Sequence, residues 1–249
     1  MVNKALIITG GGRGIGAATA RLAAARGYFV CVNYRRNRAA ADAVVAEIAA
    51  AGGAALAVAA DVASEPDVVR LFATVDAEIG PLGGLVNNAG ILEQQTRVEA
   101  IDAARIDRVF GTNVRGAFLC AREAVRRMST THGGGGGAIV NVSSRAAQLG
   151  APGEYVDYAA SKAALDALTI GLAREVAGEG IRVNGVRAGI IYTDIHADGG
   201  EPGRVDRLGP TLPMRRGGDP IEVARAILWL LSDEASYSTA SFIDVAGGR

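Results

Sequence analysis

Residues 9–16 read TGGGRGIG, and this stretch decides how the chain is expected to fold. The apolar run Ala5–Thr9 leads directly into it, and the helix-spaced stretch Ala17–Arg26 follows. A glycine turn between a buried strand and a helix brings backbone N–H groups close to phosphates. With 34 glycines in the chain, glycines that merely end a strand are the alternative. The position in the first strand–helix turn favours dinucleotide binding by Gly10, Gly14 and Gly16.

Outward from this turn, short runs rich in Val and Ile alternate with helix-spaced stretches along the whole chain. Strands that are apolar throughout are typical of a parallel sheet with helices on both faces. We therefore predict an α/β fold, a doubly wound parallel sheet of seven strands. The strands are expected at Ala5–Thr9, Phe29–Asn33, Ala54–Ala60, Leu85–Asn87, Ala138–Val142, Ile181–Val186 and Phe242–Val245. The helices are expected at Ala17–Arg26, Ala39–Ala51, Asp67–Ile79, Asp102–Met128, Ala159–Ala177 and Ile221–Leu231.

Composition limits the kinds of protein this chain can be. A length of 249 residues with 49% hydrophobic content allows one large core, and we expect a single domain over 1–249. The tract THGGGGG at 131–137 is a surface loop or, alternatively, a linker between two smaller domains. A net charge of zero argues against nucleic-acid binding. Two cysteines and no membrane-length apolar run predict a cytoplasmic protein with no disulfide framework, metal site or membrane association.

The end of the predicted second strand indicates which dinucleotide is preferred. A site for NAD(H) usually has a carboxylate there for the ribose 2′-hydroxyl, but the sequence reads Asn33, Tyr34, Arg35. Residues 1–41 hold seven basic residues and no Asp or Glu, so this arm favours an anion. Arg13 and Arg35 suit a 2′-phosphate. NADP(H) is therefore the expected cofactor and NAD(H) the alternative, with solvated arginines as the competing interpretation.

Tyr158 and Lys162 are candidates for proton transfer. They are four residues apart in a helical pattern, which places both side chains on one face. Lys162 is one of only two lysines among the 26 basic residues. A phenol titrates near ~10, and a neighbouring ammonium is expected to lower that pKa toward neutrality. An ordinary tyrosine with an incidental neighbour is the alternative.

Five motifs in order resemble the short-chain dehydrogenase/reductase family over essentially the whole chain. They are TGGGRGIG, NNAG at 87–90, Asn113, Ser143 with Ser144, and YAASK at 158–162, followed by DVAGG at 244–248. The likeness points to glucose dehydrogenase-like or ketoacyl reductase-like members and to a Rossmann fold with strand order 3-2-1-4-5-6-7.

The resemblance implies roles for individual residues. Tyr158 exchanges a proton with the substrate oxygen while a hydride moves to or from the nicotinamide, and Lys162 binds the nicotinamide ribose. Ser144, with Ser143 as the alternative, holds the substrate oxygen, and Asn113 holds a water in a proton relay. The implied cofactor-binding set is Gly10, Arg13, Gly14, Ile15, Gly16, Asn33, Tyr34, Arg35, Asp61, Val62, Asn88, Ala89, Gly90, Tyr158, Lys162, Ile191 and Thr193.

Two departures from the family pattern stand out: RAG at 187–189 lacks a frequent Pro, and Ala240 replaces a frequent Gly. The segment 192–218, rich in Gly, Pro and charge, is expected to form a lid over the substrate. His196 within it is interpreted as a lid or surface residue, and His132 as solvated. Arg145, beside Ser144, is expected to be solvated, with attraction of an anionic substrate as the alternative.

The leading hypothesis is an NADP(H)-dependent oxidoreductase that interconverts a small-molecule carbonyl and a secondary alcohol. The alternative is an inactive NADP(H)-binding regulator of the same fold. The resemblance also implies a homotetramer or homodimer assembled through the helices at 102–128 and 159–177. Substrate identity and reaction direction do not follow from the sequence.

Overall fold

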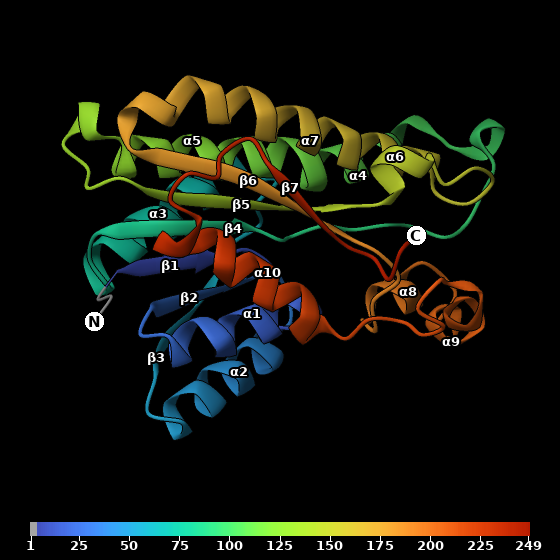
Figure 1. The fold of residues 1–249 in the computed structure, drawn as a ribbon, viewed down its shortest axis with the longest axis horizontal. Coiled ribbons are helices and arrows are strands. Elements are labelled where there is room, and N and C mark those ends of the chain that lie inside the picture. The colour runs from blue at the N-terminus through green and yellow to red at the C-terminus, as the bar shows by residue number, and fades with distance from the viewer. Residues whose placement is uncertain (1–3) are drawn as a thin grey trace.

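The computed structural model describes residues 4–249, and its centre is one seven-stranded sheet (Figure 1). The strand order is β3-β2-β1-β4-β5-β6-β7, and every neighbouring pair is parallel. This confirms the predicted doubly wound α/β fold and its strand order. The strands are β1 Ala5–Ile8, β2 Phe29–Tyr34, β3 Ala54–Ala59, β4 Leu82–Asn87, β5 Gly137–Ser144, β6 Ile181–Ala188 and β7 Phe242–Val245.

Helices cover both faces of the sheet (Figure 1). One apolar cluster joins α1, α2 and α10 to one face through residues such as Leu6, Val32 and Ile227. A second cluster joins α3, α5 and α7 to the other face through Ile7 and Phe72. Neighbouring residues Leu6 and Ile7 face opposite clusters, as strand geometry requires. The main helices are α1 Gly14–Ala25, α2 Arg38–Ala50, α3 Glu65–Glu78, α4 Ala103–Phe110, α5 Gly116–Met128, α7 Val156–Val176 and α10 Pro220–Leu231.

The helix expected at Asp102–Met128 is interrupted. A π-helical turn, Gly111–Arg115, separates α4 from α5 and contains Asn113. Such turns insert one extra residue per turn and are common at functional sites. Periodicity of apolar residues does not reveal this insertion, because the helix axis continues through it.

Helix α10 has strong capping interactions at both of its ends. Asp219 and Glu222 form a reciprocal capping box at the start of α10, and the chain has Pro220 at the first helical position. At the other end of α10, the half-buried Arg182 guanidinium donates to the carbonyls of Leu230, Leu231 and Ser232. These contacts satisfy groups that a helix end leaves unpaired.

The glycine tract at 131–137 connects α5 to β5 of the same sheet. A short 3₁₀ turn, Thr130–His132, precedes it, and His132 is exposed as predicted. Gly134 donates to the Ser129 carbonyl and Gly136 to the Met128 carbonyl, both at 2.8 Å. The tract is therefore a surface loop held by backbone hydrogen bonds.

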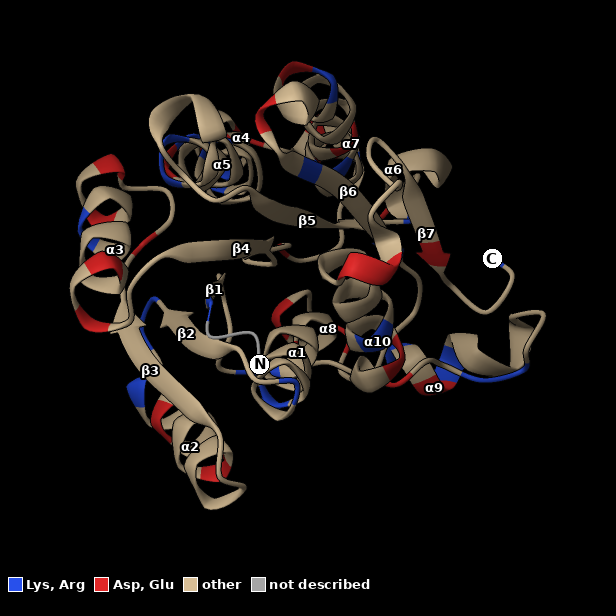
Figure 2. Cartoon of the chain, turned by 60° about the vertical axis from the view of Figure 1, so that its left-hand side comes forward, with Lys and Arg blue, Asp and Glu red and all other residues tan. Residues whose placement is uncertain are grey.

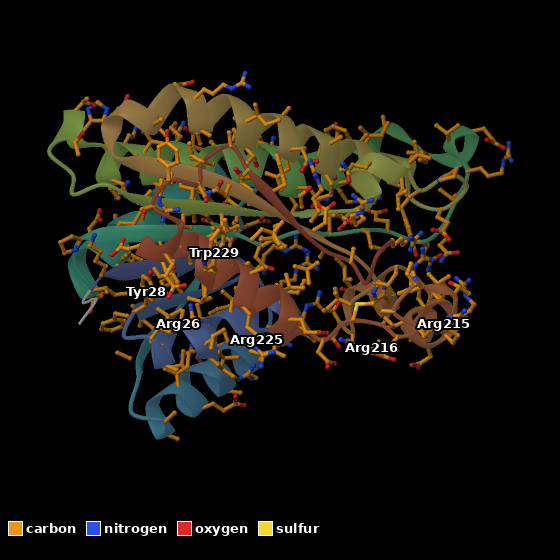
Figure 3. All side chains as sticks on the ribbon, viewed as in Figure 1. Arg26, Tyr28, Arg215, Arg216, Arg225 and Trp229 are labelled. Atoms are coloured by element: carbon orange, nitrogen blue, oxygen red, sulfur yellow. The ribbon has the colours of Figure 1, made fainter. Side chains whose placement is uncertain are left out.

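Short helices that the sequence did not predict lie beyond the carboxyl ends of the strands. They are α6 Ala146–Leu149, α8 Ile195–Asp198 and α9 Arg204–Leu208, the last two within 192–218. Figure 1 shows α8 and α9 together at one end of the sheet, near the C-terminus. Arg216, which lies between α10 and α9 in Figure 3, pairs with Glu222 of α10 at 2.6 Å and ties this segment to the core.

Most charged residues lie outside the first five strands of the sheet. Strands β1 to β5 contain no charged residue, and the blue and red segments of Figure 2 lie mainly on helices and loops. Several arginines of the basic N-terminal arm are paired, Arg21 with Glu47 and Arg38 with Asp42. Within residues 4–249, no helix combines the length and apolar character needed to cross a bilayer.

Candidate active site

A cavity of about 460 Å³ opens where the carboxyl ends of the strands meet the 192–218 segment. Adjacent strands β1 and β4 send their connections to opposite faces, which is the position where open parallel sheets leave a crevice for ligands. The cavity brings together the glycine turn, the end of β2 and the residues around Tyr158. Its lining includes the predicted residues Gly10, Arg13, Gly14, Ile15, Asn33, Tyr34, Arg35, Asp61, Val62, Asn88, Ala89, Gly90, Ser144, Tyr158, Lys162, Ile191 and Thr193.

The glycine turn is held tightly between β1 and the loop after β4. Gly10 has a φ of +63°, and a Cβ on Gly16 would lie 2.3 Å from the Gly10 carbonyl oxygen. The Asn88 amide donates to the carbonyls of Thr9 and Gly10 at 2.9 and 3.1 Å. Helix α1 starts at Gly14 without a side-chain cap and without an acidic residue in its first turn. Its free amide groups therefore favour an anion beside this turn.

The end of β2 presents amide and guanidinium groups to the cavity. Asn33 is buried, and its side chain donates to the Val58 and Ala60 carbonyls while accepting from the Gly10 N–H. Asn33 therefore braces the turn. Arg35 lies 3.8 Å from Asp61, and both side chains are exposed enough to rearrange. Asp61 also accepts from the Ala63 N–H, so it ends β3 as a turn residue while lining the cavity.

Arg13 reaches across the turn to the 192–218 segment. Its guanidinium pairs with Asp198 of α8 at 2.5 Å. Thr193 lies against the turn as well, since a Cβ on Gly14 would come within 3.0 Å of it. The 192–218 segment therefore rests directly on the glycine turn.

Tyr158 and Lys162 lie in the first two turns of α7 and face one cavity, as the i, i+4 spacing predicts. Lys162 is only 4% exposed, and its Nζ lies 5.6 Å from the Tyr158 ring centroid and donates to the Val142 carbonyl at 2.8 Å. Burial raises the pKa of Tyr158 to about 12, with an opposing hydrogen bond from Ser144. Burial lowers the pKa of Lys162 to about 8, opposed by Asp166.

These pKa shifts differ from the expectation that the ammonium lowers the phenol's pKa. In the protein alone, desolvation of the phenolate sets the pKa of Tyr158, opposed by the Ser144 hydroxyl, while the Lys162 ammonium donates to a backbone carbonyl. Tyr158 is thus held as a protonated phenol at neutral pH.

The two adjacent serines at the end of β5 point to different surroundings. The buried Ser143 hydroxyl donates to the Lys162 carbonyl at 3.3 Å, inside the protein. Ser144 accepts from the Ala146 N–H, and its hydroxyl is near enough to the Tyr158 phenol to lower that group's pKa. Strand alternation separates the two, and Ser144 is the one beside the Tyr158 phenol.

Asn113 is buried in the π-helical turn, and both its amide oxygen and its amide nitrogen have partners. Its Oδ1 accepts from the Ile91 N–H at 2.8 Å, and its Nδ2 donates to the Ile91 carbonyl and to Ser161. The side chain therefore braces the loop after β4 against α7. A relay through bound water stays a prediction.

His196 and Arg145 have more contacts within the protein than the sequence indicates. His196 is 8% exposed, lines the cavity from α8 and hydrogen-bonds the Ile191 carbonyl at 3.0 Å, so of the two expected positions, lid or surface, the structure excludes the surface one. Arg145 is paired and only partly solvated, because it pairs with Asp244 at 2.7 Å and donates to the Arg249 carbonyl while its side chain is 19% exposed. The tertiary partners that bury both groups are far away in sequence or in an unpredicted helix.

A buried ion pair next to Tyr158 was missed by the sequence analysis. Arg105 of α4 contacts both carboxylate oxygens of Asp157 at 2.7 and 3.1 Å and also donates to the Gln94 carbonyl. Burial acts to raise the pKa of Asp157, but the hydrogen bonds from Arg105 and the backbone outweigh it and hold that pKa below its ordinary value. The pair fixes the first turn of α7, where Tyr158 lies.

Comparison with known proteins agrees with this geometry. Residues 10–249 match the family model described as enoyl-(acyl carrier protein) reductase. A dehydrogenase/reductase from Sinorhizobium meliloti superposes with a TM-score of 0.91 at 32% identity, covering 100% of this chain and 95% of that one. A short-chain dehydrogenase/reductase variant from Serratia marcescens gives 0.90 at 32% identity, over 98% and 97%.

This chain belongs to the short-chain dehydrogenase/reductase family. Among its relatives, the uncharacterized oxidoreductase YgfF of Escherichia coli is 60% identical over 98% of both chains. The 3-oxoacyl-[acyl-carrier-protein] reductase FabG of Staphylococcus epidermidis is 35% identical over 99% of both. The protein is therefore an oxidoreductase of a family that acts on carbonyl and alcohol groups with nicotinamide cofactors. These names give no support to the inactive-regulator alternative.

One departure from the short-chain dehydrogenase/reductase pattern, Ala240, places a residue with a side chain in a strained backbone conformation. Ala240 adopts a φ of +56°, in the left-handed region where glycine is favoured. Its N–H donates to the Val183 carbonyl at 2.8 Å, which holds it at the entry to β7. The site itself is not affected.

Proposed function

We propose that this protein is an NADP(H)-dependent oxidoreductase that interconverts a small-molecule carbonyl and a secondary alcohol, with Tyr158 as general acid and base. The observation that carries the proposal is the convergence of Ser144, Tyr158 and Lys162 in the cavity that the glycine turn also lines. The direct test is a panel of ketones, aldehydes and acyl thioesters with NADPH, followed by absorbance. Absence of NADPH oxidation with every member would overturn the proposal.

The protonation state of Tyr158 suits the reductive direction. A pKa raised to about 12 by burial keeps the phenol protonated, so it is ready to donate to an oxygen that gains negative charge. Ser144 lines the cavity beside Tyr158, where its hydroxyl can hold that oxygen. A bound nicotinamide cofactor supplies the hydride of this reaction.

Lys162 has two roles in this proposal, one toward Tyr158 and one toward the cofactor. Its ammonium is desolvated, which lowers its pKa to about 8, and its charge beside the ring favours any phenolate that forms. Lys162 also lines the cavity, where its ammonium can bind ribose hydroxyls. Oxidation of an alcohol requires the Tyr158 phenolate, so the reverse direction is expected to gain rate as pH rises.

The residues around the glycine turn and the end of β2 fit the phosphate groups of NADP(H). The uncapped α1 N-terminus and the glycine turn favour a pyrophosphate, with Asn88, Ala89 and Gly90 alongside. Within residues 4–249, Arg13 pairs with one exposed carboxylate, Asp198, and Arg35 with another, Asp61, and a 2′-phosphate can replace either partner. No carboxylate occurs at the end of β2 in Asn33–Arg36.

Replacing Arg35 by Ala is expected to weaken NADPH binding selectively. Loss of one charge-assisted hydrogen bond to a phosphate should raise KM for NADPH about tenfold or more and leave KM for NADH within about twofold. Arg38→Ala is the matched control, because Arg38 pairs with Asp42 outside the cavity. Equal losses for both cofactors, or a wild-type preference for NADH, would contradict the 2′-phosphate role.

We further propose that residues 1–249 act as one domain whose 192–218 segment is a substrate lid, and that the protein is a homodimer or homotetramer. Two large apolar side chains are exposed in the 102–128 stretch expected at the interface, Ile106 of α4 at 43% and Phe118 of α5 at 50%. Contact with a second copy of the chain would remove these side chains from water.

Light scattering is expected to give two or four times the chain mass of 25.4 kDa. Phe118→Asp should shift the mass toward that of the single chain, because a charge at a buried contact is costly. Val69→Asp, on α3, is the control with a similarly exposed apolar residue. A wild-type protein of single-chain mass would reject self-association.

A further inference from the structure

Asp166 of α7 is a largely buried carboxylate that does not line the cavity. Its side chain is 13% exposed, and its Oδ2 accepts from the Arg187 Nε at 2.8 Å. Its Oδ1 is buried and has no hydrogen-bond partner among residues 4–249. Burying a charged group is costly, and buried polar atoms almost always have partners. An acidic residue at this position therefore requires an explanation beyond the packing of α7.

Asp166 lies one helical turn after Lys162. Residues four apart on a helix share a face, so the two side chains are neighbours, as those of Tyr158 and Lys162 are one turn earlier. Lys162 reaches β5 at the Val142 carbonyl, and Asp166 reaches β6 at Arg187. Figures 1 and 2 show α7 lying along β6. A phenol, an ammonium and a carboxylate therefore follow one another along α7.

Contacts with two strands hold the Asp166 carboxylate in place. The guanidinium carbon of Arg187 lies 3.8 Å from the centroid of the Phe242 ring, and its Nη1 lies 3.5 Å from Asp244 of β7. Asp244 also pairs with Arg145 at 2.7 Å. An arginine that stacks on a ring and contacts two carboxylates has a well-defined position. Arg187 therefore fixes the carboxylate that it contacts on α7.

The charged groups around Lys162 differ in their effect on it. Burial lowers the pKa of Lys162 to about 8, and Asp166 acts against this shift. The Tyr158 ring lies 5.6 Å from the Lys162 Nζ, and burial raises the pKa of that phenol to about 12, so it stays neutral. The helix α5 packs on α7 through apolar side chains. The other charges that face this end of α7 occur in pairs: Arg105 of α4 with Asp157, Arg187 of β6 with Asp166, and Arg145 with Asp244 of β7.

We propose that Asp166 is a positioning residue that keeps Lys162 in its ammonium form at the active site. The inference rests on the proposed carbonyl reduction and adds a residue that acts through Lys162. A negative charge close to an amine favours its protonated form. A charged Lys162 in turn favours the phenolate that Tyr158 becomes once its proton has passed to the substrate oxygen.

Nuclear magnetic resonance measures the charge of Lys162 without requiring turnover. The chain has two lysines, Lys4 and Lys162, so protein labelled at the lysine Cε gives two signals, which Lys4→Arg assigns. Asp166→Asn should lower the pH midpoint of the Lys162 signal by about one unit, because a nearby opposite charge is lost. Asparagine keeps an oxygen that can accept from Arg187, so the contact with β6 remains. Glu175→Gln, which removes an exposed carboxylate further along α7, should leave the midpoint in place.

Arg187→Gln changes the same ion pair in the opposite sense. It removes the cation that offsets the Asp166 carboxylate, so the Lys162 midpoint should rise, by about half a unit. This variant also tests the inference if Asp166→Asn does not fold. A midpoint that falls or stays in place in Arg187→Gln would contradict the inference.

The pH dependence of carbonyl reduction tests the consequence for the reaction. In Asp166→Asn, kcat/KM with NADPH and the best ketone of the panel should stay within about twofold of the wild type at pH 6, where Lys162 is charged in both proteins. At pH 9 it should be about tenfold lower, because loss of the carboxylate lowers the pKa of Lys162 and the ammonium is lost earlier as pH rises. Asp166→Glu keeps the charge and should restore much of the wild-type profile. Glu175→Gln should match the wild type at both pH values.

The outcomes separate this inference from the proposed function. An unchanged Lys162 midpoint in Asp166→Asn, or a loss of kcat/KM by the same factor at both pH values, would show that Asp166 serves only the packing of α7. Either result would overturn the inference, and NADPH oxidation by the wild type would leave the oxidoreductase proposal standing. A lowered midpoint with no carbonyl reduction by the wild type would support the action of Asp166 on Lys162 and contradict the proposed reaction.

Discussion

Tyr158→Phe is expected to lower kcat for carbonyl reduction by about 10² to 10⁴-fold, because it removes the hydroxyl group that donates the proton to the substrate oxygen. The ring and its packing remain, so the fold and the cavity should be unchanged. NADPH binding, followed by nicotinamide fluorescence, should keep its Kd within about threefold. The effect should therefore fall on kcat with little change in KM.

The control for this prediction is Tyr237→Phe, which makes the same chemical change at a fully exposed tyrosine after α10. It should leave kcat as in the wild type. Unchanged turnover in Tyr158→Phe would remove the proposed mechanism, and a large loss of NADPH affinity would show that the phenol serves binding instead of proton transfer.

The sequence predicted the fold because local pattern and topology agree. Apolar strands and a glycine turn at the first strand–helix junction are both local signals, and the structure confirms the doubly wound parallel sheet that they indicated. The strand order, also confirmed, came from the family resemblance. The i, i+4 spacing of Tyr158 and Lys162 is also local, and it correctly placed both side chains at one cavity.

What the sequence could not predict depends on contacts between distant residues. The pKa of Tyr158 is set by how deeply tertiary packing buries the phenol, and the Lys162 ammonium is held by the Val142 carbonyl of a different element. Burial of His196 likewise depends on the short helix α8, which is too brief to have a periodic pattern. A charged residue such as Arg105 is read from sequence as exposed unless its partner 52 positions away is known.

That buried pair underlies the largest expected effect on stability. Arg105→Met should lower the free energy of unfolding by about 3–5 kcal/mol, because it leaves the Asp157 carboxylate buried without its partner. For a chain of this size the melting temperature should fall by roughly 10 °C. Arg97→Met, which breaks the exposed pair with Glu99, should cost less than about 1 kcal/mol.

The double variant Arg105→Met with Asp157→Leu distinguishes a stranded charge from lost packing. It should recover much of the stability lost in Arg105→Met, since replacing both members of a buried pair is often neutral. The pKa of Asp157 is lowered in the folded state, so the pair's contribution is present above the carboxyl's unfolded pKa and is lost as pH falls through the folded value. Denaturation midpoints of the single variant and the wild type should therefore converge in acid. A gap that stays constant from neutral to acid pH, or a double variant no more stable than the single one, would assign the loss to packing around α4 and α7.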